Sequence, residues 1–125
     1  MIAVDTSSFV AYLEGAAGPD VDLLDKGLEA KQVMLPPVVV TELLSDPELS
    51  KTVVSLIKEI PQLEVSDGYW ERAGALRSQL LVKGFKARVA DALIAQSCLD
   101  NKIGLITRDG DFKAMAKVCG LLLLK

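Results

Sequence analysis

The segment IGLITRDGD, residues 103–111, decides the fold because a short apolar run ends in a polar turn that carries two aspartates. The N-terminal segment IAVDTSS, residues 2–8, has the same arrangement with a single aspartate. Short runs that are apolar at every position are typical of strands buried on both faces of a parallel sheet. Both segments are therefore predicted to be strands whose carboxyl ends present acidic side chains at one edge of a sheet.

Apolar runs alternate with helical patterns along the whole chain. Further strands are predicted at 33–35, 63–65 and 121–124. Helices are predicted at 6–13, 20–31, 38–45, 47–60, 69–82, 89–100 and 112–118. Strands separated by helices indicate an α/β fold, a three-layer α/β/α sandwich around a parallel sheet.

Length and composition indicate a globular protein and exclude several other classes. A chain of 125 residues is expected to form a single domain, residues 1–125, with one core. Hydrophobic residues make up 50% of it, which excludes a disordered chain. No apolar run approaches the roughly 20 residues of a membrane helix, and no basic leader precedes the first strand. We therefore expect a cytoplasmic protein with no membrane contact, in which Cys98 and Cys119 are reduced, buried thiols.

Charge is distributed unevenly along the chain. Residues 1–67 carry 12 acidic and 4 basic side chains, whereas residues 68–125 carry 5 acidic and 10 basic ones. A polyanionic partner is therefore expected to bind the C-terminal half, unless its lysines and arginines form ordinary solvated helix faces. The overall pI of about 4.9 argues against a protein that coats nucleic acid without specificity.

Histidine is absent from the sequence. Its absence excludes a serine–histidine triad, a histidine pair for metal-free RNA cleavage and a histidine-ligated zinc site. An enzymatic site in this chain must therefore rely on carboxylates, and a cluster of carboxylates favours a hard divalent cation.

Asp91 is the most informative of these carboxylates. At about 100° per residue, it shares a helix face with Ile94, Ala95 and Cys98. An ionised carboxylate on an apolar face is costly unless it coordinates a metal or pairs with a basic group. The alternative to a metal ligand is a buried ion pair with Arg88, about one turn earlier.

Four other acids lie close to predicted strand ends. Asp5 directly follows the first strand, and Asp109 and Asp111 follow the strand that ends near residue 106. A helix cap is the alternative role for Asp5, and turn roles are the alternative for the other two. Glu42 lies on the short helix after the second strand, where a plain surface position is the alternative. Oxygen-only ligands of this kind select Mg²⁺ or Mn²⁺ over zinc or copper.

Four segments occur in the order expected of a known family: VDTS (4–7), TEL (41–43), ADALIA (90–95) and ITRDGDF (106–112). They resemble the four signatures of PIN domains, most closely those of the small VapC-type toxins of bacterial and archaeal toxin–antitoxin pairs. The resemblance covers essentially the whole chain. Each segment alone is a weak signal, and their ordered set is a strong one.

This resemblance implies Mg²⁺- or Mn²⁺-dependent endoribonuclease activity on an RNA substrate. It also implies a five-stranded parallel sheet of order 3-2-1-4-5, a homodimer and inhibition by a VapB-type antitoxin. Carried over by position, the catalytic and metal-binding acids are Asp5, Glu42, Asp91 and Asp109, with Asp111 as an additional candidate.

The resemblance further implies that Thr6, Ser7 and Thr107 orient these carboxylates. The chemistry agrees, because a cation held by carboxylates lowers the pKa of bound water and makes a nucleophile at neutral pH. Three basic residues flank the acids in the sequence and are expected to hold RNA phosphates: Lys86, Arg88 and Arg108.

Three other functions compete with a nuclease. A phosphoacceptor signalling domain of the receiver type would need adjacent acids after the first strand, where Thr6 and Ser7 follow Asp5. A haloacid-dehalogenase-type phosphatase would need an acid at the position of Ser7. A catalytically silent PIN-like domain that binds RNA or a protein would keep the fold, and the sequence leaves this alternative open.

Overall fold

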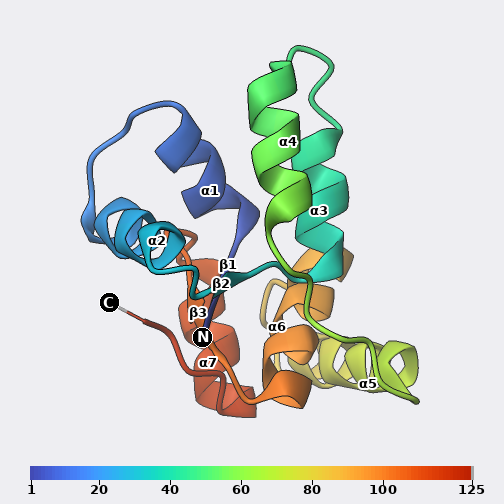
Figure 1. Cartoon of the computed structure of the whole chain (residues 1–125). Helices are drawn as coiled ribbons and strands as arrows, with labels where there is room; N and C mark the ends of the chain where they lie inside the picture. Colours follow the sequence, from blue (N-terminus) through green and yellow to red (C-terminus); the bar gives the residue numbers. More distant parts are fainter. Residues whose placement is uncertain (125) are drawn as a thin grey trace.

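A three-stranded parallel sheet lies at the centre of the computed structural model, which describes residues 1–124 (Figure 1). The middle strand, β1 (Ile2–Val4), pairs with β2 (Val33–Met34) on one side and with β3 (Gly104–Ile106) on the other. β3 is buried along its whole length, and so is β1 after its first residue. The two strands predicted to end in acids are therefore neighbours.

One additional segment flanks the sheet on each side. Leu35 forms a parallel bridge with Gln62, and Leu105 forms one with Leu123. The spatial order matches the expected 3-2-1-4-5 order, but the described residues form three strands and two single bridges rather than five strands. Pro61 lacks the N–H that a longer ladder would need at one edge, so pairing there is short.

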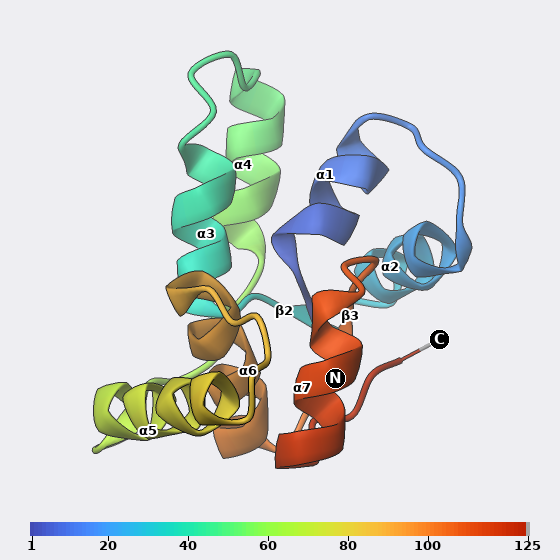
Figure 2. The same cartoon turned by 180° about the vertical axis from the view of Figure 1, so that it is seen from behind.

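Seven helices are present in residues 1–124: α1 (Thr6–Leu13), α2 (Pro19–Glu29), α3 (Pro37–Leu44), α4 (Lys51–Glu59), α5 (Tyr69–Val82), α6 (Val89–Asn101) and α7 (Asp111–Cys119). Figures 1 and 2 show α1 and α2 on one side of the sheet and α5 and α6 on the opposite side. α3 and α4 form a hairpin that extends away from the sheet in both views. Helices thus cover both sides of the sheet, as predicted, and none of the seven has the length and apolar character that crossing a bilayer requires.

The start of α4 differs from the prediction, which placed it near Pro47. Asp46 instead accepts a hydrogen bond from the backbone N–H of Glu48 at 2.9 Å and forms a turn. The helix begins at Lys51 because the Ser50 hydroxyl accepts the N–H of Val53 at 3.2 Å and caps the first turn. The cap residue therefore decides the boundary, and the proline does not.

Side chains from the sheet and from all seven helices share one hydrophobic core. Phe9, Leu24, Leu35, Ile94, Leu105 and Phe112 are among its largest fully buried members. Tyr69 belongs to this core and donates its hydroxyl hydrogen to the Leu93 carbonyl at 2.6 Å, and burial raises its pKa to about 12. Trp70 next to it is 63% exposed instead.

The two cysteines are free thiols, as predicted. Cys98 is buried, and burial raises the pKa of its thiol to about 12. Cys119 is only partly buried, and its thiol donates to the Met115 carbonyl one turn earlier at 3.0 Å.

An ion pair fastens α2 to the turn after β3. Arg108 donates from Nε to Oδ2 of Asp20 at 2.8 Å and from Nη2 to Oδ1 at 3.0 Å. The buried Ser8 hydroxyl donates to the same carboxylate at 2.8 Å. The hydrogen bond from Arg108 is the main reason that the pKa of Asp20 is lowered to about 2. This pair joins residues 88 positions apart.

Gly27 of α2 is required by the close approach of this helix to the sheet. A Cβ at this position would lie 2.6 Å from Ile2 Cδ1 and 2.9 Å from Val33 Cγ2. The Ile2 methyl group ends a flexible side chain, but Val33 is buried and β-branched, so it has little freedom to move.

We expect Gly27→Ala to lower the free energy of unfolding by about 1 kcal/mol. Overpacking costs about 1–3 kcal/mol and outweighs the helix preference of alanine, which is about 1 kcal/mol. Gly74 on α5 is the matched control, because a Cβ there meets nothing within 4 Å. Urea unfolding should show Gly74→Ala to be stabilised, and an equal stabilisation of Gly27→Ala would contradict the packing argument.

We expect Asp20→Asn to lower the free energy of unfolding at pH 7 by about 1 kcal/mol, since it removes one side of a charge-assisted pair. A carboxylate whose pKa is lowered on folding contributes stability above its unfolded pKa of about 4 and loses it as the pH falls toward 2. The difference between wild type and variant should therefore shrink between about pH 4 and pH 2. Asp22→Asn, an exposed change in the same turn of α2, is the control and should unfold in urea at pH 7 much as the wild type does.

Candidate active site

Asp5 lies where β1 meets β3. Its backbone N–H donates to the Ile106 carbonyl at 2.9 Å, so the two strand ends are held side by side. Its side chain is 4% exposed. It occupies the N-cap position of α1, but its carboxylate makes no capping hydrogen bond. The helix-cap alternative therefore does not account for this buried acid.

Two hydroxyl groups hold the Asp5 carboxylate. Ser7 Oγ donates to Oδ2 at 2.7 Å, and Thr107 Oγ1 donates to the same oxygen at 2.8 Å. Burial raises the pKa of Asp5, the two hydroxyl hydrogen bonds lower it, and the nearby charge of Asp91 raises it. The net direction is upward, because burial disfavours the ionised form of Asp5.

The turn after β3 continues this network toward the other acids. Thr107 Oγ1 accepts the N–H of Asp109 at 3.0 Å, and Asp109 Oδ1 accepts the N–H of Asp111 at 2.9 Å. Asp109 therefore has the turn role considered as an alternative for one of these two residues. Its second oxygen, Oδ2, points to a different partner, Arg88.

Asp91, Asp109 and Asp111 form the tightest acidic cluster in the described part of the chain. Each offers one carboxylate oxygen, and these oxygens all lie within 4.8 Å of one another. Asp91 is 3% exposed on the first turn of α6, and the other two are half-buried. Asp5 lies outside this group of three but close enough for the charge of Asp91 to act on it. Asp111, expected only as an additional acid, stands inside the cluster.

Arg88 bridges two of these acids. Its Nε donates to Asp91 Oδ2 at 3.1 Å, and its Nη2 donates to Asp91 Oδ1 at 3.3 Å and to Asp109 Oδ2 at 3.2 Å. The hydrogen bond with Asp91 is the main reason that the pKa of Arg88 is raised. The ion pair considered as the alternative for Asp91 is thus present, within the same cluster that was predicted to bind a metal.

Glu42 lies apart from this cluster. It is exposed on α3, and its Oε1 accepts a hydrogen bond from Thr6 Oγ1 at 2.7 Å. Thr6 begins α1 directly after Asp5, so this bond links Glu42 to the same end of the sheet. The structure therefore places Thr6 against Glu42, whereas Ser7 and Thr107 contact Asp5.

The three basic residues expected to hold phosphates have different surroundings. Lys86 is exposed on the loop before α6. Arg88 is 67% exposed although it contacts two acids. Arg108 is engaged with Asp20, a partner that the sequence did not reveal because an acid near a helix start is ordinary.

The acidic residues fit a hard divalent cation. Every side chain in the cluster offers carboxylate oxygen, which Mg²⁺ and Mn²⁺ prefer. The described residues place four carboxylates near one another (Asp5, Asp91, Asp109 and Asp111), and a single guanidinium group contacts two of them. This excess of negative charge favours a divalent cation at the cluster.

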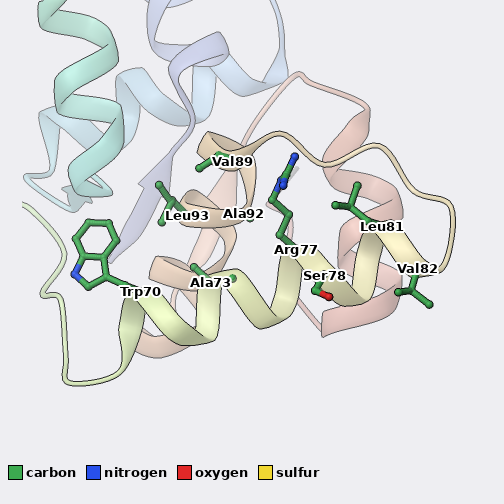
Figure 3. Close-up of a pocket in the computed structure, with 10 residues that line it drawn as sticks. Trp70, Ala73, Arg77, Ser78, Leu81, Val82, Val89, Ala92 and Leu93 are labelled. Atoms are coloured by element: carbon green, nitrogen blue, oxygen red, sulfur yellow. The ribbon is translucent and has the colours of Figure 1, made fainter.

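An apolar groove lies beside the acidic site, between α5 and α6 (Figure 3). Its volume is about 570 Å³. It is lined by Trp70, Leu81, Val82, Val89, Ala92 and Leu93, among others. Trp70, Leu81, Val82 and Val89 are exposed. No signal in the sequence predicts this groove, because its apolar residues also fit a buried helix face.

Comparisons with known proteins agree with this architecture. The family model of the PIN domain matches residues 2–118. Among solved structures, the crystal structure of FitAcB from Neisseria gonorrhoeae is similar, with a TM-score of 0.72 and 21% sequence identity over 100% of this chain and 97% of that chain. At this identity the likeness shows the fold alone, and a search of curated proteins found no match. Because the family model spans most of the sequence, the chain belongs to the PIN domain family.

Proposed function

We propose that this protein is a Mg²⁺- or Mn²⁺-dependent endoribonuclease and the toxin of a toxin–antitoxin pair. The observation that carries the proposal is the cluster of Asp91, Asp109 and Asp111 beside the buried Asp5. Membership of the PIN family supports it, because PIN domains are generally metal-dependent nucleases. The likeness to VapC-type toxins in the four sequence segments supports the narrower assignment.

The cluster and Asp5 have separate tasks in this proposal. Asp91, Asp109 and Asp111 hold the cation, since their oxygens are mutually closest. Ser7 and Thr107 keep Asp5 in one orientation. Its carboxylate adds a fourth negative charge close to that of Asp91. A bound Mg²⁺ or Mn²⁺ supplies Lewis-acid activation of water and neutralises charge on the scissile phosphate.

The flanking side chains supply substrate contacts. Lys86 and Arg88 are exposed next to the acids and are proposed to hold RNA phosphates. Glu42 stands at the rim of the site, held by Thr6, and is proposed to act on the substrate side rather than as a principal ligand. Arg108 is proposed to brace the turn that carries Asp109, because Asp20 holds its guanidinium.

We further propose that the protein is a homodimer in which the groove between α5 and α6 meets its copy. A contact between identical surfaces must be self-complementary, and an apolar patch satisfies this condition, whereas a strongly charged one repels itself. The exposed Trp70, Leu81, Val82 and Val89 lie in this groove. Because α6 also carries Asp91, such a contact runs along the helix that builds the acidic site.

We expect Asp91→Asn to reduce RNA cleavage in the presence of Mg²⁺ or Mn²⁺ by at least about 100-fold. Loss of a metal-ligating carboxylate removes several kcal/mol of transition-state stabilisation, and each 1.36 kcal/mol is about tenfold in rate. The measurement is the cleavage rate of total RNA, with circular dichroism as a test of folding. Asp22→Asn, an exposed change of the same charge on α2, should cleave at the wild-type rate.

Wild-type cleavage by Asp91→Asn would contradict the assignment of this residue. If the wild-type protein cleaves no RNA with either ion, the catalytically silent binding domain becomes the better account. In cells, induced wild type should arrest growth and Asp91→Asn should not. Co-expression of an adjacent gene that encodes the proposed VapB-type antitoxin should relieve the arrest.

We expect Val82→Glu to convert the dimer to a monomer, because it introduces a charge into the apolar contact of both subunits. Light scattering coupled to size-exclusion chromatography measures the mass directly. Leu122→Glu is the control, since Leu122 is 62% exposed and lies outside the groove. A Val82→Glu protein that stays dimeric would show that another surface forms the dimer.

A further inference from the structure

Arg88 occupies the position of a cation in the acidic cluster. It lies at the N-cap of α6, and its side chain is 67% exposed. Despite this exposure, it makes three hydrogen bonds to Asp91 and Asp109, at 3.1 to 3.3 Å. Both acids belong to the group of three whose oxygens lie within 4.8 Å of one another. The guanidinium therefore contacts two of the three carboxylates that would hold a metal ion.

The contacts of Asp91 make it difficult for this carboxylate to bind Arg88 and a metal ion at the same time. Arg88 contacts both of its oxygens, Oδ2 through Nε and Oδ1 through Nη2. An ion that coordinates Asp91 would therefore lie beside the guanidinium on the same carboxylate. Both oxygens of Asp109 also accept hydrogen bonds, Oδ1 from the N–H of Asp111 and Oδ2 from Arg88. A divalent ion and the guanidinium thus compete for the same negative charge.

Arg88 is free to leave without disturbing the core. Most of its side chain is in solvent, and a carboxylate as buried as Asp91 is costly without a cation beside it. Asp91 therefore favours a cation beside it, and two cations on one carboxylate repel each other. The exposed arginine is the one that moves.

We propose that Arg88 is a built-in counter-ion that neutralises Asp91 and Asp109 in the metal-free protein and is displaced when a divalent ion binds. The displaced guanidinium then lies at the rim of the site, where it is available to an RNA phosphate. This inference rests on the metal site of the proposed function and adds a step to it: metal loading frees a substrate-binding group.

The test is Mn²⁺ binding to the full-length protein without RNA, measured by isothermal titration calorimetry. Removing a competitor should tighten binding, so we expect Arg88→Gln to bind Mn²⁺ about tenfold more tightly than wild type. Lys86→Gln removes the same charge two residues away and is the matched control for long-range electrostatics. Arg88→Lys should fall between wild type and Arg88→Gln, because a lysine ammonium does not reproduce the planar, forked contact with two carboxylates.

Thermal unfolding gives a second readout. The effect of Mn²⁺ on it distinguishes a counter-ion from an arginine that only stabilises the fold. In EDTA, Arg88→Gln should unfold at a lower temperature than wild type, because Asp91 is left buried without its partner. Saturating Mn²⁺ should remove this difference, since the ion replaces the guanidinium and stabilises the folded state.

Weaker Mn²⁺ binding by Arg88→Gln than by Lys86→Gln, or equal binding by the two, would overturn the proposal. A stability loss that Mn²⁺ does not restore would also overturn it. If neither wild type nor Arg88→Gln binds Mn²⁺, the metal site itself fails and the proposed function fails with it. That outcome differs from failure of the counter-ion alone, in which wild type binds the ion and Arg88→Gln gains nothing.

Discussion

The parallel pairing of β1 with β3 is the constraint on which the rest of the site depends. The hydrogen bond from Asp5 to Ile106 joins the ends of two strands, so the residues that follow both strands share one small volume. Those residues are acids and hydroxyls, and the first turn of α6 adds Asp91 to them. Negative charges held so close repel one another, and hydroxyl and guanidinium donors relieve that repulsion in the structure.

The central strands and the acids at their ends were predictable because both signals are local. A run such as 104–106 is apolar at every position, and the acid directly after a strand must project from its end. Asp91 was predictable for a related reason, since helical periodicity places it on the face that is buried in the structure. The boundary of α4 was not predicted, because Pro47 outweighed the cap at Ser50 in the sequence pattern.

The partners of side chains that are far apart in the chain could not be predicted from the sequence. Nothing near Arg108 marks Asp20 as its partner, because 88 residues separate them and both residue types are common on surfaces. Nothing local distinguishes Trp70 from the neighbouring Tyr69 either, yet Tyr69 is buried and Trp70 is exposed. For Asp91, an ion pair and a metal site were weighed as alternatives, and the structure places the arginine within the acidic cluster itself.

The single bridges at Gln62 and Leu123 bear on the behaviour of the protein in a crowded solution. An exposed sheet edge offers unpaired backbone groups that recruit strands from other molecules and seed aggregates. Here each margin of the described sheet ends in a contact one residue long, at Gln62 on one side and at Leu123 on the other. In a sequence as rich in valine and leucine as this one, such short margins leave little regular strand for another molecule to extend.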